Sequence, residues 1–547
     1  MVKKIFLLIL FSVGFFSFSQ EVISKTDWQE DLRYLQKTVN TQYPFLFKKI
    51  SATTFNETVD SFHKAIPAME EHEIVVGFSR IIGLFQYGHT RMSYSDSSIQ
   101  FHSIPVEFYR FKKGIYIKAA QKEHQLLIGA KVIAIEDVTI DKVIKAVYPT
   151  VPVENALFFD AYGLNHMTIP EVLHAQGITA ELKKSLRLLL EKDGKQSEYT
   201  IKATTELWPP MHYGEVKPDS DWVNGRNKSE TPLYLKNFDK IYYYEYLPDS
   251  KTVYVRHSRI QNDKTENVND FYNRVFKFID SNDVEKLVID VRLNGGGNNF
   301  LNKPIIKGII SNSKINQPGK FFVITGRRTF SACQNLINEL DNYTDVLFVG
   351  EPSSENINFY GDNKRVVLPK SGLPVYLSFA WWQDKSQWEN ADYIKPHYPI
   401  EMTYDNYISN EDVVLDAALN FESINFVMKP MEYLTELFEQ GRFDEVTKEG
   451  VRMANDPAYS FIDFEREFNS VGSIMMGNNN EGALLVFKLA VKVFPESQNT
   501  WGNLAQTQWE MGDFENAKVS CKKVLSISDK GGAAFAAKRM LKKIVNK

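Results

Sequence analysis

Apolar residues recur at helical spacing in the first hundred residues of the chain. Trp28, Leu32, Leu35 and Val39 would share one face of a helix that begins near Thr26 or Asp27. Similar patterns cover residues 55–66 and 71–85, and the last of them leads into Gln-Tyr-Gly-His-Thr at 86–90. We therefore predict a helical N-terminal cap over residues 20–100.

The periodicity then changes to short β-like runs between residues 101 and 206. Such runs cover 106–111, 115–119, 132–135 and 199–203, and residues 127–135 are typical of a turn followed by a buried strand. The segment resembles a PDZ-type module, whose sheet edge can hold an extended peptide. A small β-rich spacer without such a function is the alternative interpretation.

Strands and helices alternate through residues 207–428. The patterns predict strands at 253–257, 287–291, 321–325 and 346–349, with helices at 269–280, 301–310 and 331–340. This alternation is typical of an α/β domain built around a largely buried sheet.

The tail, residues 429–547, is helical and repetitive. Two segments of the tail correspond to each other at one constant offset. Ala483, Phe487, Ala490 and Pro495 of the first correspond, in this order, to Ala517, Cys521, Val524 and Asp529 of the second. A 34-residue period of helix pairs resembles tetratricopeptide repeats. Such repeats form a concave surface, which here would bind a partner protein or the protein's own body.

Composition narrows the class of protein. A length of 547 residues suggests three or four domains, and 64 basic against 68 acidic residues argue against a nucleic-acid binder. A hydrophobic content of 43% excludes bulk disorder, and two cysteines exclude a disulfide scaffold or a cysteine-built metal centre. Cys333 and Cys521 fall in different predicted domains, so we expect both to be unpaired, with Cys333 packed in a helix.

Residues 1–19 are predicted to be an export signal. Lys3 and Lys4 precede an apolar run at 5–16, and Ser17 and Ser19 supply the small residues of a cleavage site after Ser19. An uncleaved membrane anchor is the alternative, although the run is short for a span of roughly 20 residues. We expect an exported protein, periplasmic or secreted, without a membrane span once the signal is removed.

Ser331 follows a predicted strand and opens a predicted helix. Backbone N–H groups at a helix start are free, which suits a nucleophile whose attack creates an oxyanion. The alternative is that Ser331 or Thr329 simply caps the helix. The Gly-x-Ser-x-Gly elbow of α/β-hydrolases does not occur at this serine.

A second candidate segment is Asp-Val-Arg-Leu-Asn-Gly-Gly-Gly at 290–297, which ends a predicted strand. Its glycines let the backbone turn tightly and bring N–H groups toward a ligand. No Gly-Lys-Ser/Thr follows, so a Walker A phosphate loop is excluded, and an oxyanion site fits better. Asp290 and Arg292 would form an ion pair that holds the loop.

Together these segments resemble the tail-specific, or C-terminal processing, serine peptidases, a family that includes the tricorn core protease and a retinoid-binding protein. The family signature is Asp-Leu-Arg-x-Asn-x-Gly-Gly, Thr-x-Ser-Ala and Gly-Glu-Pro-Thr, matched here at 290–297, 329–332 and 350–353. The resemblance covers about residues 25–405. It implies a helical cap, a PDZ-like module and a ClpP/crotonase-like peptidase core. With the all-α repeat domain of the tail, the expected fold is an α/β multidomain protein.

The family uses two catalytic arrangements. A Ser–Lys dyad needs a lysine soon after Gly-Glu-Pro-Thr, but residues 353–358 contain none and Lys364 lies several residues further on. The Ser-His-Glu arrangement of tricorn matches better. That resemblance implies Ser331 as nucleophile, His89 as general base and Glu389 as the supporting acid. The oxyanion would be held by the N–H of Ala332 and one from Gly296 or Gly297.

The chain departs from this pattern near the proposed base. Gly88 stands where tricorn has a second serine, Tyr87 replaces an aspartate, and His397 follows Pro396 where an aspartate is usual. These changes affect how the triad is oriented, and His397 is an alternative base. Trp381 and Trp382 either form an aromatic wall of the substrate cleft or pack at a sheet edge.

The remaining histidines show no paired metal-ligand spacing, and no metal or organic cofactor is implied. They are His63, His72, His102, His124, His166, His174, His212, His257 and His397.

The sequence thus predicts an exported serine peptidase that hydrolyses peptides or unfolded protein tails through an acyl-enzyme at Ser331. The module would capture the substrate, and the repeats would bind a protein partner. Two alternatives remain: a catalytically weak or dead protein that binds a ligand on the same fold, and a body that serves mainly as scaffold for the repeats.

Overall fold

The structure is a computed structural model that describes residues 23–217, 220–422, 426–459 and 462–545. The predicted export signal and its cleavage site lie outside the described residues. Within those ranges, no helix combines the length and the apolar character needed to cross a membrane.

Three helices form the N-terminal part of the protein: α1 (Lys25–Gln42), α2 (Ala52–Ala65) and α3 (Glu71–Gly83). The first helix begins slightly earlier than predicted, because Ser24, and neither Thr26 nor Asp27, is its N-cap. The Ser24 side chain accepts the N–H of Asp27 at 3.1 Å, and the Asp27 carboxylate accepts the N–H of Ser24 at 3.2 Å. This reciprocal capping box satisfies two otherwise free donors.

A seven-stranded antiparallel sheet follows, with the order β10-β3-β4-β6-β7 and with β2 and β5 paired to β3 and β4. Its strands are β2 (Val106–Phe111), β3 (Gly114–Gln121), β4 (Lys131–Ile135), β5 (Val138–Thr139), β6 (Ser185–Lys192), β7 (Lys195–Lys202) and β10 (Trp222–Asn224). Helices α4 (Ile140–Val147) and α6 (Pro170–Ala175) belong to the same region. Apolar residues of this sheet and of α1 to α3 form one continuous core, so the two regions fold together. The PDZ-like character of the sheet stays a prediction.

The α/β core is a six-stranded sheet with the order β11-β12-β13-β14-β15-β18. Its strands are β11 (Tyr242–Leu247), β12 (Thr252–His257), β13 (Lys286–Asp290), β14 (Phe321–Thr325), β15 (Leu347–Gly350) and β18 (Tyr398–Pro399), all parallel except β11. Helices α7 (Val268–Ser281), α8 (Lys303–Ser311) and α9 (Ala332–Tyr343) pack on one face, and α11 (Val413–Leu419) packs on the other. Successive strand residues alternate between the two faces, which explains the unbroken apolar runs of the sequence.

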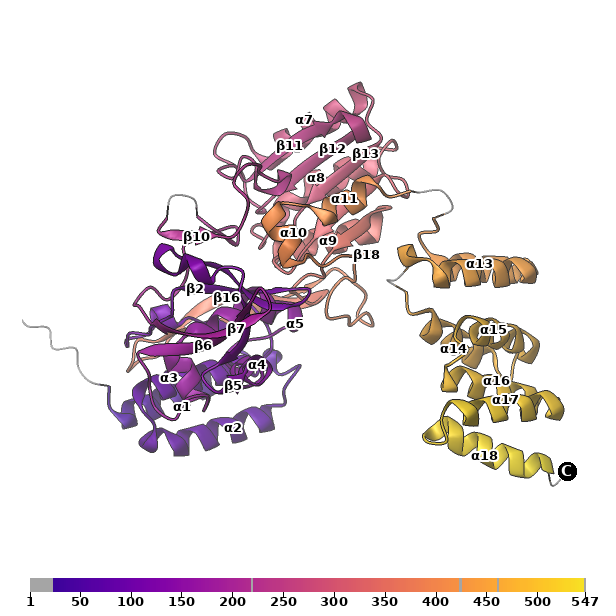
Figure 1. Ribbon diagram of the computed structural model, residues 1–547, viewed down its shortest axis with the longest axis horizontal. Helices are drawn as coiled ribbons and strands as arrows, with labels where there is room; N and C mark the ends of the chain where they lie inside the picture. The colour runs from indigo at the N-terminus through magenta and orange to yellow at the C-terminus, as the bar shows by residue number, and fades with distance from the viewer. Residues whose placement is uncertain (1–22, 218–219, 423–425, 460–461, 546–547) are drawn as a thin grey trace, which may run out of the picture.

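A long hairpin connects the two parts of the body (Figure 1). Its strands β16 (Asn358–Val367) and β17 (Pro374–Gln383) form a three-stranded sheet with β1 (Arg91–Met92). Leu368, Val375 and Leu377 from this hairpin lie in the N-terminal core, although they follow the α/β strands in sequence. The hairpin therefore holds the segment after α3 against the α/β core.

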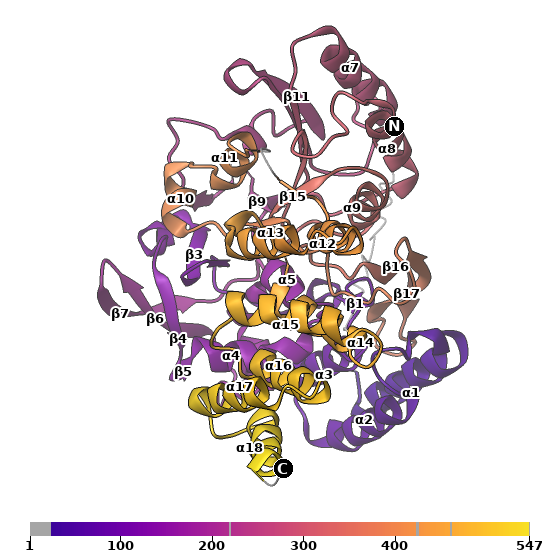
Figure 2. The same ribbon diagram turned by 90° about the vertical axis from the view of Figure 1, so that its right-hand side faces the viewer.

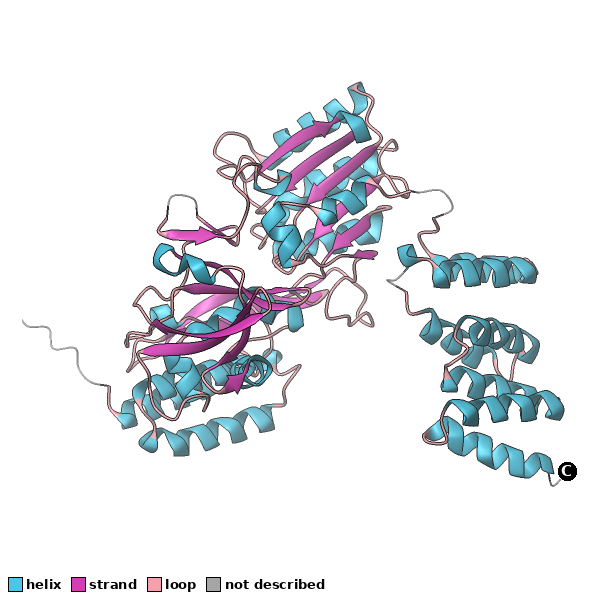
Figure 3. Cartoon of the chain, in the orientation of Figure 1, coloured by secondary structure: helices cyan, strands magenta, loops and turns pink. Residues whose placement is uncertain are grey.

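The tail consists of helices alone in the described residues after 429 (Figure 3). They are α12 (Pro430–Glu439), α13 (Phe443–Asn455), α14 (Phe464–Met475), α15 (Asn480–Val493), α16 (Gln498–Glu510), α17 (Phe514–Ile527) and α18 (Gly532–Val545), together with a 3-10 turn at Pro457–Tyr459. The interval between the starts of α15 and α17 equals the interval between the starts of α16 and α18. Figure 2 shows the helices following one another from α12 and α13 to α18. The identity of this region as tetratricopeptide repeats stays a prediction.

Candidate active site

Ser331 lies in a strained turn between β14 and α9. Its φ of 56° and ψ of −129° are unusual for a residue other than glycine, and such strain is often found at functional sites. The Ser331 side chain occupies the N-cap position of α9 but makes no capping hydrogen bond. Thr329 is buried, and its hydroxyl donates to the carbonyl of Val291 at 3.0 Å, so it holds the turn and leaves α9 uncapped. The simple N-cap alternative is therefore not what the geometry shows.

The glycine loop after β13 touches this turn. A Cβ atom on Gly296 would lie 2.6 Å from the Cβ of Ser331 and 2.9 Å from the nitrogen of Ala332, so only glycine fits. The N–H of Gly296 donates to the Asn294 side chain at 2.9 Å. The N–H groups of Gly297 and Ala332 have no acceptor among the described residues, which leaves them available to an oxyanion.

An ion-pair network fixes the start of this loop. The predicted pair of Asp290 and Arg292 is confirmed, with a separation of 2.9 Å. Arg292 also makes two hydrogen bonds, of 2.9 and 3.0 Å, to Asp412 at the N-cap of α11. The Tyr254 hydroxyl donates to Asp290 at 2.8 Å. All these groups are largely buried, so the loop is tied to the face of the sheet that carries α11.

His89 follows α3 and lies next to the turn of Ser331. Its ring stacks on Phe330, with centroids 4.8 Å apart, and faces Phe359 on a nearly parallel plane at 6.3 Å. Asn363 on β16 donates to the His89 carbonyl at 3.0 Å. Only 16% of the side chain is exposed, and this burial lowers the pKa of His89. Burial therefore favours the neutral imidazole, which is the form that a general base needs.

Glu355 connects the proposed base to the proposed nucleophile. Its side chain is fully buried, and one carboxyl oxygen accepts the N–H of Ser331. The other oxygen lies 3.4 Å from Nε2 of His89. Burial raises the pKa of Glu355 well above its usual range. Glu355 was not predicted from the sequence; the available signal was an acid in a short stretch that directly follows the Gly-Glu-Pro-Ser segment.

The structure does not bring Glu389 to the same place. Its side chain is exposed in the loop after β17, and its described hydrogen bonds are made by the backbone, from its N–H to Ser386 and from Asn358 to its carbonyl. In the described part of the chain, no hydrogen bond joins Oγ of Ser331 to His89. Ser331, His89 and the glycine loop thus lie together, with Glu355 as their acidic neighbour.

A second buried acid lies behind His89. Glu154 accepts the N–H of Gly88 at 3.0 Å, and burial together with the neighbouring Glu355 raises its pKa. Lys49 opposes this rise. Gly88 itself has no room for a side chain, because its Cβ would lie 2.3 Å from the Phe158 ring and 2.9 Å from the Phe330 ring. Aromatic packing thus explains why no second serine stands before His89.

A cavity of about 480 Å³ adjoins His89. Most of its wall is apolar and comes from Ile82, Met92, Val151, Pro152, Phe158, Tyr162 and Phe330. Arg91, His166 and Asn363 are among its polar residues. A cavity of this kind can hold an apolar side chain of a ligand.

The other sequence candidates lie elsewhere. Trp381 packs against Tyr360, with ring centroids 4.8 Å apart, and Trp382 donates to Asp362 at 3.2 Å. Neither tryptophan is among the described residues that line the cavity next to His89. His397 is half-buried beside β15, where Nδ1 accepts the N–H of Phe348 and burial lowers its pKa to about 4.

Both cysteines are free and buried, as expected. Metal-ligating atoms do meet at one place in the described residues, formed by Glu70, His72 and His174. The two histidines are 102 residues apart, so no local spacing pattern reveals the group.

By sequence, no known protein family and no curated protein matches the chain. Among solved structures, mature CPAF complexed with lactacystin is similar over 72% of this chain and 99% of that chain, with 11% identity and a TM-score of 0.51. The match to the tricorn protease spans 72% of this chain and 36% of the tricorn chain, with 14% identity and a TM-score of 0.34. The match to the photosystem II D1 C-terminal processing protease spans 69% of this chain and 92% of that protease, with 11% identity and a TM-score of 0.32. Over 72% of its length the chain thus has the fold of mature CPAF.

Proposed function

We propose that the protein is an exported serine peptidase, which hydrolyses peptide bonds in peptides or unfolded protein tails through an acyl-enzyme at Ser331. One observation carries the proposal: the N–H of Ser331 and Nε2 of His89 approach the same buried carboxyl group of Glu355. This arrangement holds a neutral imidazole next to a serine hydroxyl that does not cap helix α9. The fold shared with mature CPAF supports the same class of enzyme.

The chemistry follows from the groups present. His89 takes the proton of the Ser331 hydroxyl while the oxygen attacks the peptide carbonyl. The N–H groups of Ala332 and Gly297 hold the oxyanion, and losing one such donor typically costs about 10²–10³ in turnover. His89 then gives its proton to the leaving amine. Water, activated by the same imidazole, hydrolyses the ester and frees Ser331.

Glu355 is the acid that supports His89 in this proposal. In the resting site burial disfavours charge on both groups, because it lowers the pKa of His89 and raises that of Glu355. When His89 accepts the serine proton, the Glu355 carboxyl oxygen that lies 3.4 Å from Nε2 can accept the N–H of the imidazolium and so stabilise it. Glu389, which the tricorn resemblance assigns to this role, has an exposed side chain and would need a rearranged loop to take part.

The cavity next to His89 suggests the substrate preference. Its apolar lining fits a large apolar side chain beside the scissile bond, since burial of such a side chain contributes about 1.5–3 kcal/mol. The PDZ-like sheet would hold the extended chain of the substrate by its edge. The tail helices would bind a protein partner on their concave side.

A ligand-binding protein without activity is the second candidate. It is favoured by the missing hydrogen bond between Oγ of Ser331 and His89 among the described contacts. Catalytic hydrogen bonds often form only when substrate is bound, so this geometry is also compatible with an enzyme.

The deciding experiment compares the wild type with Ser331→Ala. We expect a fluorophosphonate probe to label the wild type and the variant Ser313→Ala, an exposed serine after α8, but not Ser331→Ala. Cleavage of a peptide library should disappear with the label. Equal labelling or equal cleavage by wild type and Ser331→Ala would favour the binding protein.

A further inference from the structure

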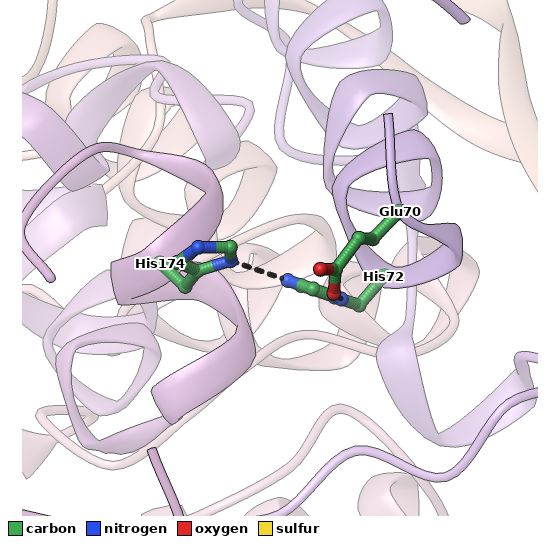
Figure 4. A group of neighbouring side chains, drawn as sticks. All are labelled: Glu70, His72 and His174. Carbon is green, nitrogen blue, oxygen red and sulfur yellow. Dashed lines mark hydrogen bonds and ion pairs between the residues drawn. The ribbon is translucent and has the colours of Figure 1, made fainter. Parts of the chain in front are cut away.

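Two histidines from distant parts of the chain meet where helices α3 and α6 pack (Figure 4). His72 lies in the first turn of α3, and His174 lies in the last turn of α6. Nε2 of His72 is 2.8 Å from Nδ1 of His174. Only 5% of His72 is exposed, so its ring is held in place by its surroundings.

Glu70 adds a carboxylate to this pair. One ligand atom from each of the three residues lies within 4.8 Å of the others. A Glu70 oxygen also lies 3.5 Å from Nδ1 of His72, the ring nitrogen that does not face His174. Glu73 accepts the N–H of Glu70 at 2.6 Å and so fixes its backbone. The Glu70 side chain remains 66% exposed and can turn toward the histidines.

Two imidazoles and one carboxylate are the ligand set of many zinc sites, which keep a fourth position for water. Zinc binds imidazole nitrogen at about 2.0–2.1 Å with tetrahedral angles, so the two nitrogens would stand about 3.3 Å apart. From 2.8 Å this requires a shift of about half an ångström, which a small rotation of the less buried His174 ring provides.

Acidic side chains lie around the pair. Burial and His174 oppose positive charge on His72, whereas the carboxylates of Glu70, Glu73 and Glu171 favour it. Glu171 lies on α6 and is held by His102, with 2.7 Å between oxygen and Nδ1. Acidic groups thus surround the histidine pair, which lowers the energy of a divalent cation at this place.

We propose that Glu70, His72 and His174 bind one Zn²⁺ ion, which links α3 to α6. The ion joins segments that are 102 residues apart, and binding to the folded state alone stabilises the protein by mass action. This site is separate from Ser331 and His89, and the inference does not depend on peptidase activity.

Titration calorimetry with ZnCl₂ on the full chain without an affinity tag tests the site. We expect one ion per chain with micromolar or tighter affinity, and a higher thermal midpoint with zinc. His174→Ala and Glu70→Gln should each weaken binding at least tenfold. His63→Ala, on α2 and outside the three-residue cluster, is the matched control and should bind as the wild type does.

Two results would overturn the inference. One is the absence of saturable zinc binding by the wild type. The other is an unchanged affinity in both His174→Ala and Glu70→Gln, which would assign the ion to another place. Circular dichroism checks that these variants are folded. Cobalt substitution gives an independent readout, since tetrahedral Co²⁺ absorbs visible light strongly and His174→Ala should lose that band.

Discussion

Glu355 illustrates what individual residues contribute to this site. Its carboxyl group has no access to solvent, yet it approaches the backbone of the proposed nucleophile and the ring of the proposed base. Such a buried acid is costly unless it remains neutral or is paired. We infer that it is kept because it fixes the backbone of Ser331 and the orientation of His89.

Glu355→Gln should lower kcat/KM by about 10²–10⁴, the usual contribution of acid–base catalysis. The pH profile provides a second readout. Activity requires neutral His89 and therefore rises with pH through the pKa of the His89–Glu355 pair. Without this second titratable group the rise follows His89 alone, whose pKa burial lowers, so we expect it at lower pH.

Glu389→Gln is the matched control for that experiment. Because its side chain is exposed, we expect kcat/KM and its pH profile to stay near those of the wild type. If Glu389→Gln were the inactive variant and Glu355→Gln the active one, the tricorn-like assignment would be right and ours wrong.

Gly88 provides a test of packing at the same scale. A Cβ atom at this position would overlap the rings of Phe158 and Phe330, and Phe330 supports the His89 ring. We expect Gly88→Ala to destabilise the protein by about 1–3 kcal/mol, as overpacked cores do. Chemical denaturation measures this loss. Gly177→Ala has open space around it, so only its positive φ of 71° disfavours the change.

At the scale of elements, the site is made where neighbouring parallel strands end. Strands β13 and β14 pair along their length, so the glycine loop and the turn of Ser331 leave the same edge of the sheet. Both strands and helix α9 were predicted within a few residues, because buried parallel strands are short apolar runs bounded by Gly and polar turns. The Arg292 network then fixes the loop against α11.

Arg292→Met should test this network. The change leaves Asp290 and Asp412 buried without their cation, and breaking a buried pair in this way costs about 3–5 kcal/mol. Lys236→Met removes a more exposed pair with Glu245 and should cost less than about 1 kcal/mol. Urea unfolding of both variants distinguishes these expectations; equal losses would contradict a special role for Arg292.

At the scale of the molecule, the proposed site needs both parts of the body. The hairpin β16–β17 leaves the α/β core, pairs with β1 and enters the N-terminal core. Thr90, next to His89, donates to Ser378 on β17 at 2.8 Å. His89 and Ser331, which are far apart in the sequence, are therefore brought together by this hairpin and by the ring of Phe330.

The tail is expected to be a separate folding unit, because its apolar clusters are formed by its own helices. It contacts the core of the body near Phe426. Deleting residues 429–547 should leave cleavage of short peptides within about twofold of the wild type, as expected for a separate folding unit. A fluorogenic peptide assay measures this. A large loss on short peptides would show that the tail completes the active site.

Local sequence patterns predict the order of helical, β-rich, α/β and helical regions, the strand ends that carry the glycine loop and Ser331, and the Asp290–Arg292 pair. These features depend on periodicity and on contacts between residues close in the chain. Three features became visible only in the folded protein. They are the acid that faces His89, the need for glycine at position 88, and the meeting of Glu70, His72 and His174. Their partners lie far apart in the chain, and burial and distance across such separations leave no local pattern.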